Sequence, residues 1–264
     1  MVGEAGSGGS WFQRFLLPGF ALKAVIIGGG YATGRELAEY FVPAGPWGGL
    51  AGMLLATLIW SVVAALTFAL ARQLHAYDYR SFFQQLLGPG WVLFEAAYLI
   101  FVVLILAVFG AAAGAIGAAT FGWPELMGAV VLAAAILFAT AFGEAGVERL
   151  FKYASMLIYA VYALFLFFAL TRFGDRIGSG FAAAGPPAAG WMAGGITYAS
   201  YNIVGAVVVL PVLRHLTSRR DALIAGAIAG PLTMLPAILF FVAMMAFYPG
   251  IGDETLPSDF LLRQ

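Results

Sequence analysis

The sequence predicts an all-α protein, a polytopic membrane helical bundle, on three observations. First, 62% of the 264 residues are hydrophobic and only 10% are charged, whereas a soluble domain carries about 25% charged residues. Second, the apolar residues gather into about seven segments of the length, roughly 20 residues, that crosses the hydrocarbon core of a bilayer. Third, glycine-rich stretches interrupt two of these segments, which is typical of the discontinuous helices that hold solutes in transporters.

The N-terminal segment differs in composition from the rest of the chain. Residues 1–16 begin with a run rich in Gly and Ser and then place Trp11 beside Arg14, so we expect a disordered or interfacial N-terminus. A single transmembrane domain, residues 17–264, follows it. The apolar segments that form its predicted spans are residues 17–40, 47–70, 91–120, 124–142, 150–170, 188–213 and 222–248.

Each predicted span has a local pattern of its own. The first is rich in glycine near its centre, and the second carries no charge. The third is longer than a bilayer requires and should tilt. Pro124 opens the fourth, because proline fits the first turn of a helix, and the fifth ends before Arg172. The sixth again contains a glycine-rich stretch, and Pro231 and Pro236 are expected to kink the seventh.

Basic residues are concentrated in alternate loops. The loop between the fifth and sixth spans holds Arg172 and Arg176, and Arg263 lies in the tail. The larger group lies at the N-terminal end and after the second, fourth and sixth spans: Arg14, Lys23, Arg72, Arg80, Arg149, Lys152, Arg214, Arg219 and Arg220. The positive-inside rule therefore predicts a multi-pass protein of the bacterial cytoplasmic (inner) membrane with its N-terminus in the cytoplasm.

Composition argues against several function classes. The chain has no cysteine, so disulfides and thiolate metal sites are excluded. Its two histidines, His75 and His215, lie in basic stretches, and no histidine metal centre is expected. A net charge of zero gives no reason to expect nucleic acid as a partner. Because the HExxH and GxSxG motifs are absent, we expect no enzyme and no cofactor other than Na⁺ or H⁺ as a coupling ion.

The first span is interrupted in its middle by residues 26–36, which read IIGGGYATGRE. Each glycine costs roughly 1 kcal/mol relative to alanine in a helix, so three in succession oppose a continuous helix. Backbone that leaves the helix inside a bilayer must find other hydrogen-bond partners. We therefore expect an unwound segment that offers backbone dipoles to a solute, with Arg35 and Glu36 directly after it.

The sixth span repeats this feature. Residues 190–202 read GWMAGGITYASYN, which is again glycine-rich and then polar inside an apolar run. The first and sixth spans begin five spans apart and therefore run in opposite directions. Two interrupted helices in that relation are the expected mark of an inverted repeat.

These residues resemble a known family. The stretch Gly28-Gly29-Gly30-Tyr31-Ala32-Thr33-Gly34-Arg35-Glu36 resembles a signature in the first helix of YkvI-type membrane proteins, and Tyr201-Asn202 followed by Leu210-Pro211 resembles their sixth-helix pattern. The wider similarity, from residue 17 to the end, is to the amino acid–polyamine–organocation transporter superfamily with the LeuT fold. The resemblance implies two inverted five-helix repeats, with substrate at the unwound helices one and six and sodium between helices one and eight.

The chain departs from the ten-helix pattern of that superfamily. It has five helices plus two, so the second repeat is incomplete and helices eight to ten have no counterpart. Either the sequence is a fragment of a ten-helix carrier, which we favour, or two chains supply the missing contacts. We accordingly expect that the 264-residue chain alone does not transport.

The two interrupted spans supply the candidate site residues. Arg35, Glu36 and Glu39 are assigned to ion coupling, because acids inside a membrane are costly and usually line cavities or proton relays. The substrate-binding residues assigned to the unwound segments are Gly28, Gly29, Gly30, Tyr31 and Thr33 from span one, and Thr197, Tyr198, Ser200, Tyr201 and Asn202 from span six.

Several of these residues have a purely structural alternative. The glycines would serve close helix packing, although three in succession exceed what packing needs. Arg35 and Glu39 are four residues apart and would form an ordinary surface ion pair. Asn202 would make an interhelical hydrogen bond, since a buried amide needs partners.

The predicted function is secondary active transport of a small organic solute, as an ion-coupled symport driven by a proton or sodium, with alternating access around helices one and six. The alternative is a non-transporting structural or assembly subunit that retains the transporter fold, and a channel is a third possibility. The expected partners are the solute and the lipid bilayer, with a homo-oligomer left open. Neither the substrate nor the coupling ion follows from the sequence.

Overall fold

The computed structural model describes residues 9–27 and 33–264, apart from the side chains of residues 144, 145 and 151. The disorder predicted for residues 1–8 and the unwinding predicted at Gly28, Gly29, Gly30 and Tyr31 lie outside the described residues. The part of the chain that is described contains helices and no strands, which confirms the all-α prediction.

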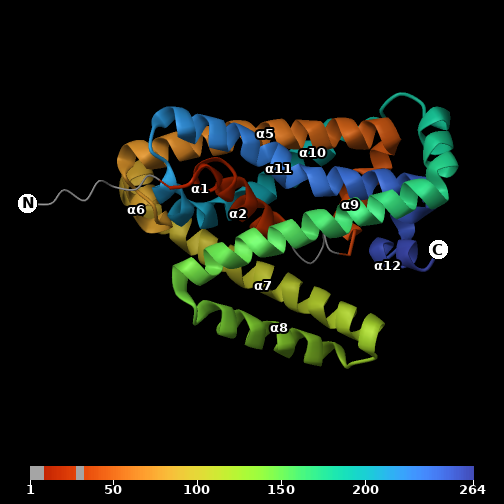
Figure 1. The fold of residues 1–264 in the computed structure, drawn as a ribbon, viewed down its shortest axis with the longest axis horizontal. Coiled ribbons are helices and arrows are strands. Elements are labelled where there is room, and N and C mark those ends of the chain that lie inside the picture. Colours follow the sequence, from red (N-terminus) through yellow and green to blue (C-terminus); the bar gives the residue numbers. More distant parts are fainter. Residues whose placement is uncertain (1–8, 28–32) are drawn as a thin grey trace, which may run out of the picture.

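The chain folds into long helices joined by short turns (Figure 1). The α-helices are α1 (Trp11–Phe15), α2 (Leu17–Ile26), α4 (Arg35–Tyr40), α5 (Gly45–Leu74), α6 (Tyr79–Leu87), α7 (Trp91–Phe121), α8 (Glu125–Thr140), α9 (Gly143–Ala183), α10 (Trp191–Asn202), α11 (Arg219–Met244) and α12 (Pro257–Leu262). The 3₁₀ segments are η1 (Val42–Ala44), η2 (Gly88–Gly90), η3 (Ile203–His215), η4 (Met245–Phe247) and η5 (Gly250–Asp253).

Among the described residues, five helical segments are long and apolar enough to cross a membrane, and the seven predicted spans stay a prediction. The apolar helices α2 and α8 are shorter than a span. The helix α2 ends at Ile26, and α8 has 16 residues between its caps Pro124 and Ala141. The five segments are Arg35–Leu74, Tyr79–Phe121, Gly146–Ala183, Trp191–His215 and Arg219–Phe247.

The core lies where α2, α5, α10 and α11 pack together (Figure 1). The most extensive contact between two helices joins α11 to α5. Trp60, Phe68, Tyr198 and Phe241 are among the large side chains that are fully buried there. The helices α7 and α8 form a hairpin on one side of this core, and most of their apolar side chains are exposed. That exposure suits a surface that faces lipid.

The first span is interrupted, as its glycines predict. The helix α2 ends at Ile26, and α4 begins only at Arg35. Gly34 precedes α4 with φ +79°, in the left-handed region that favours glycine. A Cβ at this position would lie 2.7 Å from Cε1 of Phe240, so a side chain is excluded by space as well. The break therefore has a fixed geometry on its C-terminal side.

The sixth span differs from its prediction. The helix α10 runs without a break through Gly194 and Gly195, so the interruption predicted within residues 190–202 is wrong. A Cβ at Gly195 would lie 2.6 Å from the carbonyl oxygen of Gly52, which shows that these glycines permit close packing on α5. The helix changes its winding only after Asn202, where η3 continues for 13 residues. The inverted repeat itself stays a prediction.

The fifth span is longer than predicted. The helix α9 has 41 residues and extends beyond residues 150–170 at both ends. Arg172 and Arg176, which were expected in a loop, therefore lie in the last turns of this helix. Glu148 lies in its second turn.

Candidate functional site

The interrupted first span meets the sixth span at a cluster of tyrosines. Tyr40, the last residue of α4, places its ring centroid 5.8 Å from that of Tyr198 and 5.7 Å from that of Tyr201. The rings of Tyr198 and Tyr201 stand edge to face at 5.8 Å. Two helices that are 150 residues apart in the sequence thus bring three aromatic rings together.

Buried contacts hold α10 in place at this junction. Trp60 of α5 donates its indole Nε1–H to the carbonyl of Ala199 over 3.1 Å. Tyr198 is fully buried, with its ring 5.0 Å from that of Phe41. Asn202 is buried and donates from Nδ2 to the carbonyl of Tyr198 over 3.0 Å. This hydrogen bond of Asn202 therefore lies within its own helix.

Glu36 lies at the centre of this junction with no ordinary partner. Its carboxyl faces the hydroxyl of Tyr201, yet the two groups do not form a hydrogen bond of normal geometry. Glu36 Oε2 and the hydroxyl oxygens of Tyr198 and Tyr201 are all buried without a hydrogen-bond partner among the described residues. Leaving a buried polar group unsatisfied costs about 1–3 kcal/mol. These three atoms are therefore the described polar groups of the junction that could still accept or donate a hydrogen bond.

The other predicted coupling residues are exposed, although the Glu39 carboxylate still acts electrostatically on Glu36 and Tyr40. Arg35 is exposed and donates from Nη1 to the carbonyls of Gly252 and Glu254, over 3.1 and 3.2 Å. Glu39 is exposed too, and it forms no ion pair with Arg35 within the described chain. The predicted pair between these two residues is therefore wrong, because the α4 arginine is engaged by the backbone of η5 and its flank.

The predicted substrate residues divide into two groups. Thr33 is buried just before α4, and its carbonyl accepts the backbone N–H of Ser258 over 3.0 Å. Tyr198, Tyr201 and Asn202 lie at the junction. Thr197 and Ser200 are exposed, and the structure does not bring them to Glu36. Residues 198, 201 and 202 are three or four positions apart and share a face of α10, with Thr197 at the edge of that face and Ser200 outside it.

A cavity of about 300 Å³ opens beside the break, with Thr33, Tyr162 and Phe240 among its lining residues. Its other walls come from α7, α9 and the segment around α12. Glu36, Tyr198 and Tyr201 do not line it. The candidate site therefore rests on the unpartnered polar atoms and not on the size of this cavity.

Lys23 is a buried charge that sequence reasoning missed. It is 0% exposed inside α2, although the sequence counted it with the loop residues. Its Nζ donates to the carbonyl of Ser155 over 2.7 Å and lies 3.5 Å from the ring centroid of Tyr159. No carboxylate of the described chain pairs with it. The signal in the sequence was its position, a single lysine well inside the apolar run FALKAVII.

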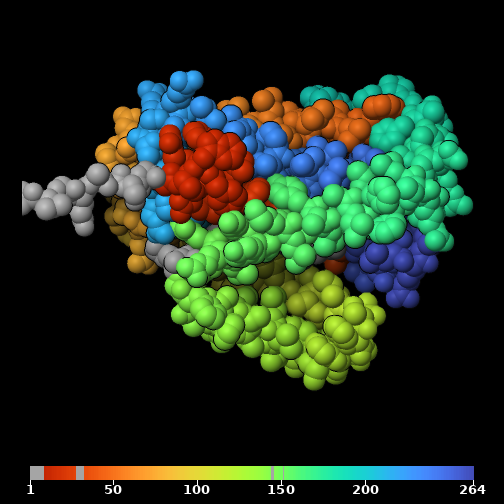
Figure 2. All heavy atoms as spheres, viewed as in Figure 1, coloured from red at the N-terminus to blue at the C-terminus, as the bar shows by residue number. Residues whose placement is uncertain are grey.

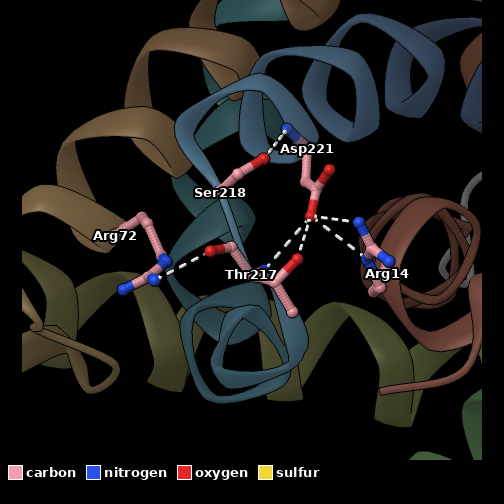
Figure 3. Close-up of polar contacts among 5 residues, drawn as sticks. All are labelled: Arg14, Arg72, Thr217, Ser218 and Asp221. Atoms are coloured by element: carbon pink, nitrogen blue, oxygen red, sulfur yellow. Dashed lines mark hydrogen bonds and ion pairs between the residues drawn. The ribbon is translucent and has the colours of Figure 1, made fainter. Parts of the chain in front are cut away.

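A second polar cluster ties three elements at the N-terminal end of the molecule (Figure 3). Asp221 Oδ2 accepts hydrogen bonds from Arg14 Nε and Nη2, at 3.1 and 2.6 Å, and from the hydroxyl of Thr217 at 2.5 Å. Ser218 caps α11 by accepting the backbone N–H of Asp221 over 3.0 Å. Arg72 of α5 donates to the carbonyl of Thr217 over 3.0 Å. The sequence signal was the Ser-x-x-Asp capping pattern before an apolar run.

Comparison with known proteins gives one named relative. The chain is similar to a protein of Bacillus subtilis (strain 168) described as the uncharacterized membrane protein YkvI. The two are 24% identical over 248 residues, which cover 92% of this chain and 67% of the relative. No family model and no solved structure matches the chain.

With the five apolar helices, the likeness to YkvI supports a multi-pass membrane protein. The resemblance of the glycine-rich and Tyr-Asn motifs to YkvI-type proteins agrees with it. The wider superfamily stays a prediction.

Proposed function

We propose that this chain serves the transport of a small organic solute, as a secondary active transporter coupled to a proton or sodium. No enzymatic activity is proposed. The chain would lie in a bacterial cytoplasmic membrane with its N-terminus inside. The single observation that carries the proposal is the buried Oε2 of Glu36, which, like the hydroxyls of Tyr198 and Tyr201, has no hydrogen-bond partner among the described residues.

The chemistry of this junction favours a cationic group as its occupant. A carboxylate accepts hydrogen bonds, and aromatic faces attract cations that lie within about 6 Å of the ring centroid. Tyr40 of α4 and Tyr198 and Tyr201 of α10 form a cluster of rings near Glu36. We therefore propose that a solute binds here through an amino group, or that the coupling proton or sodium neutralises Glu36 when a neutral solute binds.

The segments next to the junction, η3 after α10 and the break before α4, would allow the helices to move relative to each other. The 13-residue η3 is far longer than usual for a 3₁₀ segment, and such stretches inside a span are typical of hinges. Converting it to an α-helix would shorten it by roughly 6 Å, since the rise falls from about 2.0 to 1.5 Å per residue. Alternating access would combine this change with movement at the break before α4.

A ligand-stabilisation screen of the purified chain tests the proposal. Amino acids, amines, nucleobases and simple carboxylates are added in turn, and the melting temperature is followed. Binding to the folded state alone contributes about 2.7 kcal/mol at a ligand concentration of 100 Kd. We expect amino-bearing solutes to stabilise the chain. Stabilisation by carboxylates alone would contradict an amine site at Glu36.

Two tyrosine variants test whether the stabilisation by the solute arises from binding at the junction. Tyr201→Phe removes a buried hydroxyl that has no partner among the described residues, whereas Tyr153→Phe removes one from a side chain that is 64% exposed. We expect the first substitution to lower the stabilisation by the solute and the second to leave it unchanged. Equal responses would place the solute elsewhere.

A further inference from the structure

A polar hollow of about 460 Å³ lies at the N-terminal end of the molecule, away from the Glu36 junction. Figure 2 shows the α1–α2 segment, in red, lying against the beginning of α9 in green on this face. One wall comes from the start of the chain and the other from the second and third turns of α9. The residues that line it are Ser10, Phe12, Gln13, Leu17, Glu148, Arg149 and Lys152.

Both basic residues of the hollow lack an acidic partner. Arg149 makes no hydrogen bond or ion pair with a described residue. Lys152 has only aromatic neighbours, with its Nζ 5.2 Å from the ring centroid of Phe12 and 5.5 Å from that of Tyr153. Basic side chains this close together repel each other unless an anion lies between them. The lining thus holds two positive charges that nothing described neutralises.

The acidic residue of the hollow, Glu148, is already paired with basic residues that lie outside the hollow. Glu148 Oε1 accepts a hydrogen bond from Arg214 Nη2 over 2.6 Å, and its Oε2 lies 3.3 Å from His215 Nε2. Arg214 and His215 belong to η3 and do not line the hollow. Among the described lining residues, the charge that remains unpaired is therefore positive.

The α1 wall adds hydrogen-bond donors that remain free. Ser10 and Gln13 form a capping box, in which Gln13 Oε1 accepts the backbone N–H of Ser10 and Ser10 Oγ accepts that of Gln13. This arrangement uses the acceptor atoms of both side chains. The Gln13 amide NH₂ and the Ser10 hydroxyl hydrogen are left as donors, and donors beside two cations are the chemistry that binds a phosphate.

We propose that this hollow binds the phosphate of an anionic phospholipid head group. A membrane lipid suits the site because apolar residues adjoin it: Phe12 and Leu17 form part of its lining. Trp11, 65% exposed on the same short helix, provides an interfacial anchor next to it. Basic pockets between helices at a membrane surface are known to recognise such head groups.

Native mass spectrometry of the purified chain tests this proposal. The probes are phosphatidylglycerol and phosphatidylcholine, offered in equal amounts in a neutral detergent to the parent and to the double variant Arg149→Gln/Lys152→Gln. The matched control is Arg219→Gln/Arg220→Gln, which removes two exposed charges of α11 outside the hollow at the same end. We expect the parent to prefer phosphatidylglycerol. The first double variant should bind it roughly 30-fold more weakly, because each basic residue near an anionic surface contributes about fivefold.

The outcomes separate the lipid from other anions. A control that loses as much binding as the double variant would overturn the proposal, because the effect would then come from overall charge. Equal binding of the two lipids by the parent would overturn it too. Inorganic phosphate and glycerol phosphate are added as competitors. Displacement of the lipid by either at matched concentration would assign the hollow to a soluble anion instead.

Discussion

Glu36 and Lys23 are both charged side chains inside a membrane protein, but their surroundings differ. Lys23 has its ammonium fixed by the Ser155 carbonyl and the Tyr159 ring. The Glu36 carboxyl has one oxygen that is buried and free of any described partner. A fixed cation holds helices together, whereas an unsatisfied carboxyl is available to a ligand. For that reason Glu36, and not Lys23, is the centre of the proposed site.

Replacing Lys23 tests this distinction through stability. A buried charge exchanged for an apolar side chain of similar volume is often neutral or stabilising, by up to about 4 kcal/mol. We expect Lys23→Met to keep or raise the melting temperature. Lys23→Ala should lower it, because the cavity left by the smaller side chain reduces the free energy of unfolding by about 2–4 kcal/mol. A large loss of stability in Lys23→Met would show that the contacts of the ammonium group stabilise the fold by more than its removal from water costs.

At the scale of helices, glycines have two different roles in this chain. Gly34 needs its positive φ before α4. Gly195 allows α10 to pack directly on the backbone of α5 at Gly52. The sequence places both in similar glycine-rich patterns, and it therefore predicted two breaks where the structure has one. Nothing in the sequence of α10 shows that its glycines face a neighbouring backbone, because that depends on which helix packs there.

Gly195→Ala distinguishes packing from a hinge. The added Cβ would lie 2.6 Å from the Gly52 carbonyl oxygen, and a backbone atom does not move aside easily. We expect a loss of about 1–3 kcal/mol in the free energy of unfolding. Gly174→Ala in α9 is the matched control, because a Cβ there meets nothing within 4 Å. It should gain roughly 0.5–1 kcal/mol from helix propensity. A stabilised Gly195→Ala would contradict the packing role.

The contact between α1 and α11 depends on a single carboxylate oxygen. Arg14 and Asp221 are 31% and 8% exposed in their side chains, so the pair is partly shielded from water. We expect Arg14→Gln and Asp221→Asn to be coupled by about 0.5–3 kcal/mol in a double-mutant cycle of stability. If the stability losses of Arg14→Gln and Asp221→Asn were additive, the ion pair would contribute nothing, and apolar contacts alone would hold α1 against α11.

At the scale of the whole molecule, the sequence predicts the class of fold well and its boundaries less well. The all-α membrane bundle and the break in span one follow from composition and glycine spacing. The 41-residue length of α9 does not, because helix ends inside a protein are set by packing as well as by apolar length. Of the predicted site residues, Glu36 lies near Tyr198 and Tyr201, whereas Thr197 and Ser200 are exposed; the site itself stays a prediction.

The orientation of the molecule can be measured directly, since the chain has no cysteine of its own. Gln73 at the end of α5 and Ser179 at the end of α9 are both exposed. If the N-terminus is cytoplasmic, an impermeant thiol reagent applied to intact cells should label Ser179→Cys and leave Gln73→Cys unlabelled. The opposite pattern would reverse the proposed topology, and permeabilised cells, in which both should react, serve as the control.

The most direct test of the central claim is an equilibrium binding isotherm for the solute that the screen identifies. It is measured for the parent, Glu36→Gln and Glu39→Gln, which lose the same carboxylate from the same helix in a half-buried and an exposed position. Hydrogen bonds to charged groups contribute about 1.5–3 kcal/mol, so we predict that Glu36→Gln raises Kd by roughly 10- to 150-fold. Glu39→Gln should stay within about twofold of the parent. An unchanged Kd in Glu36→Gln, or equal losses in both variants, would contradict the assignment of Glu36 as the binding carboxyl.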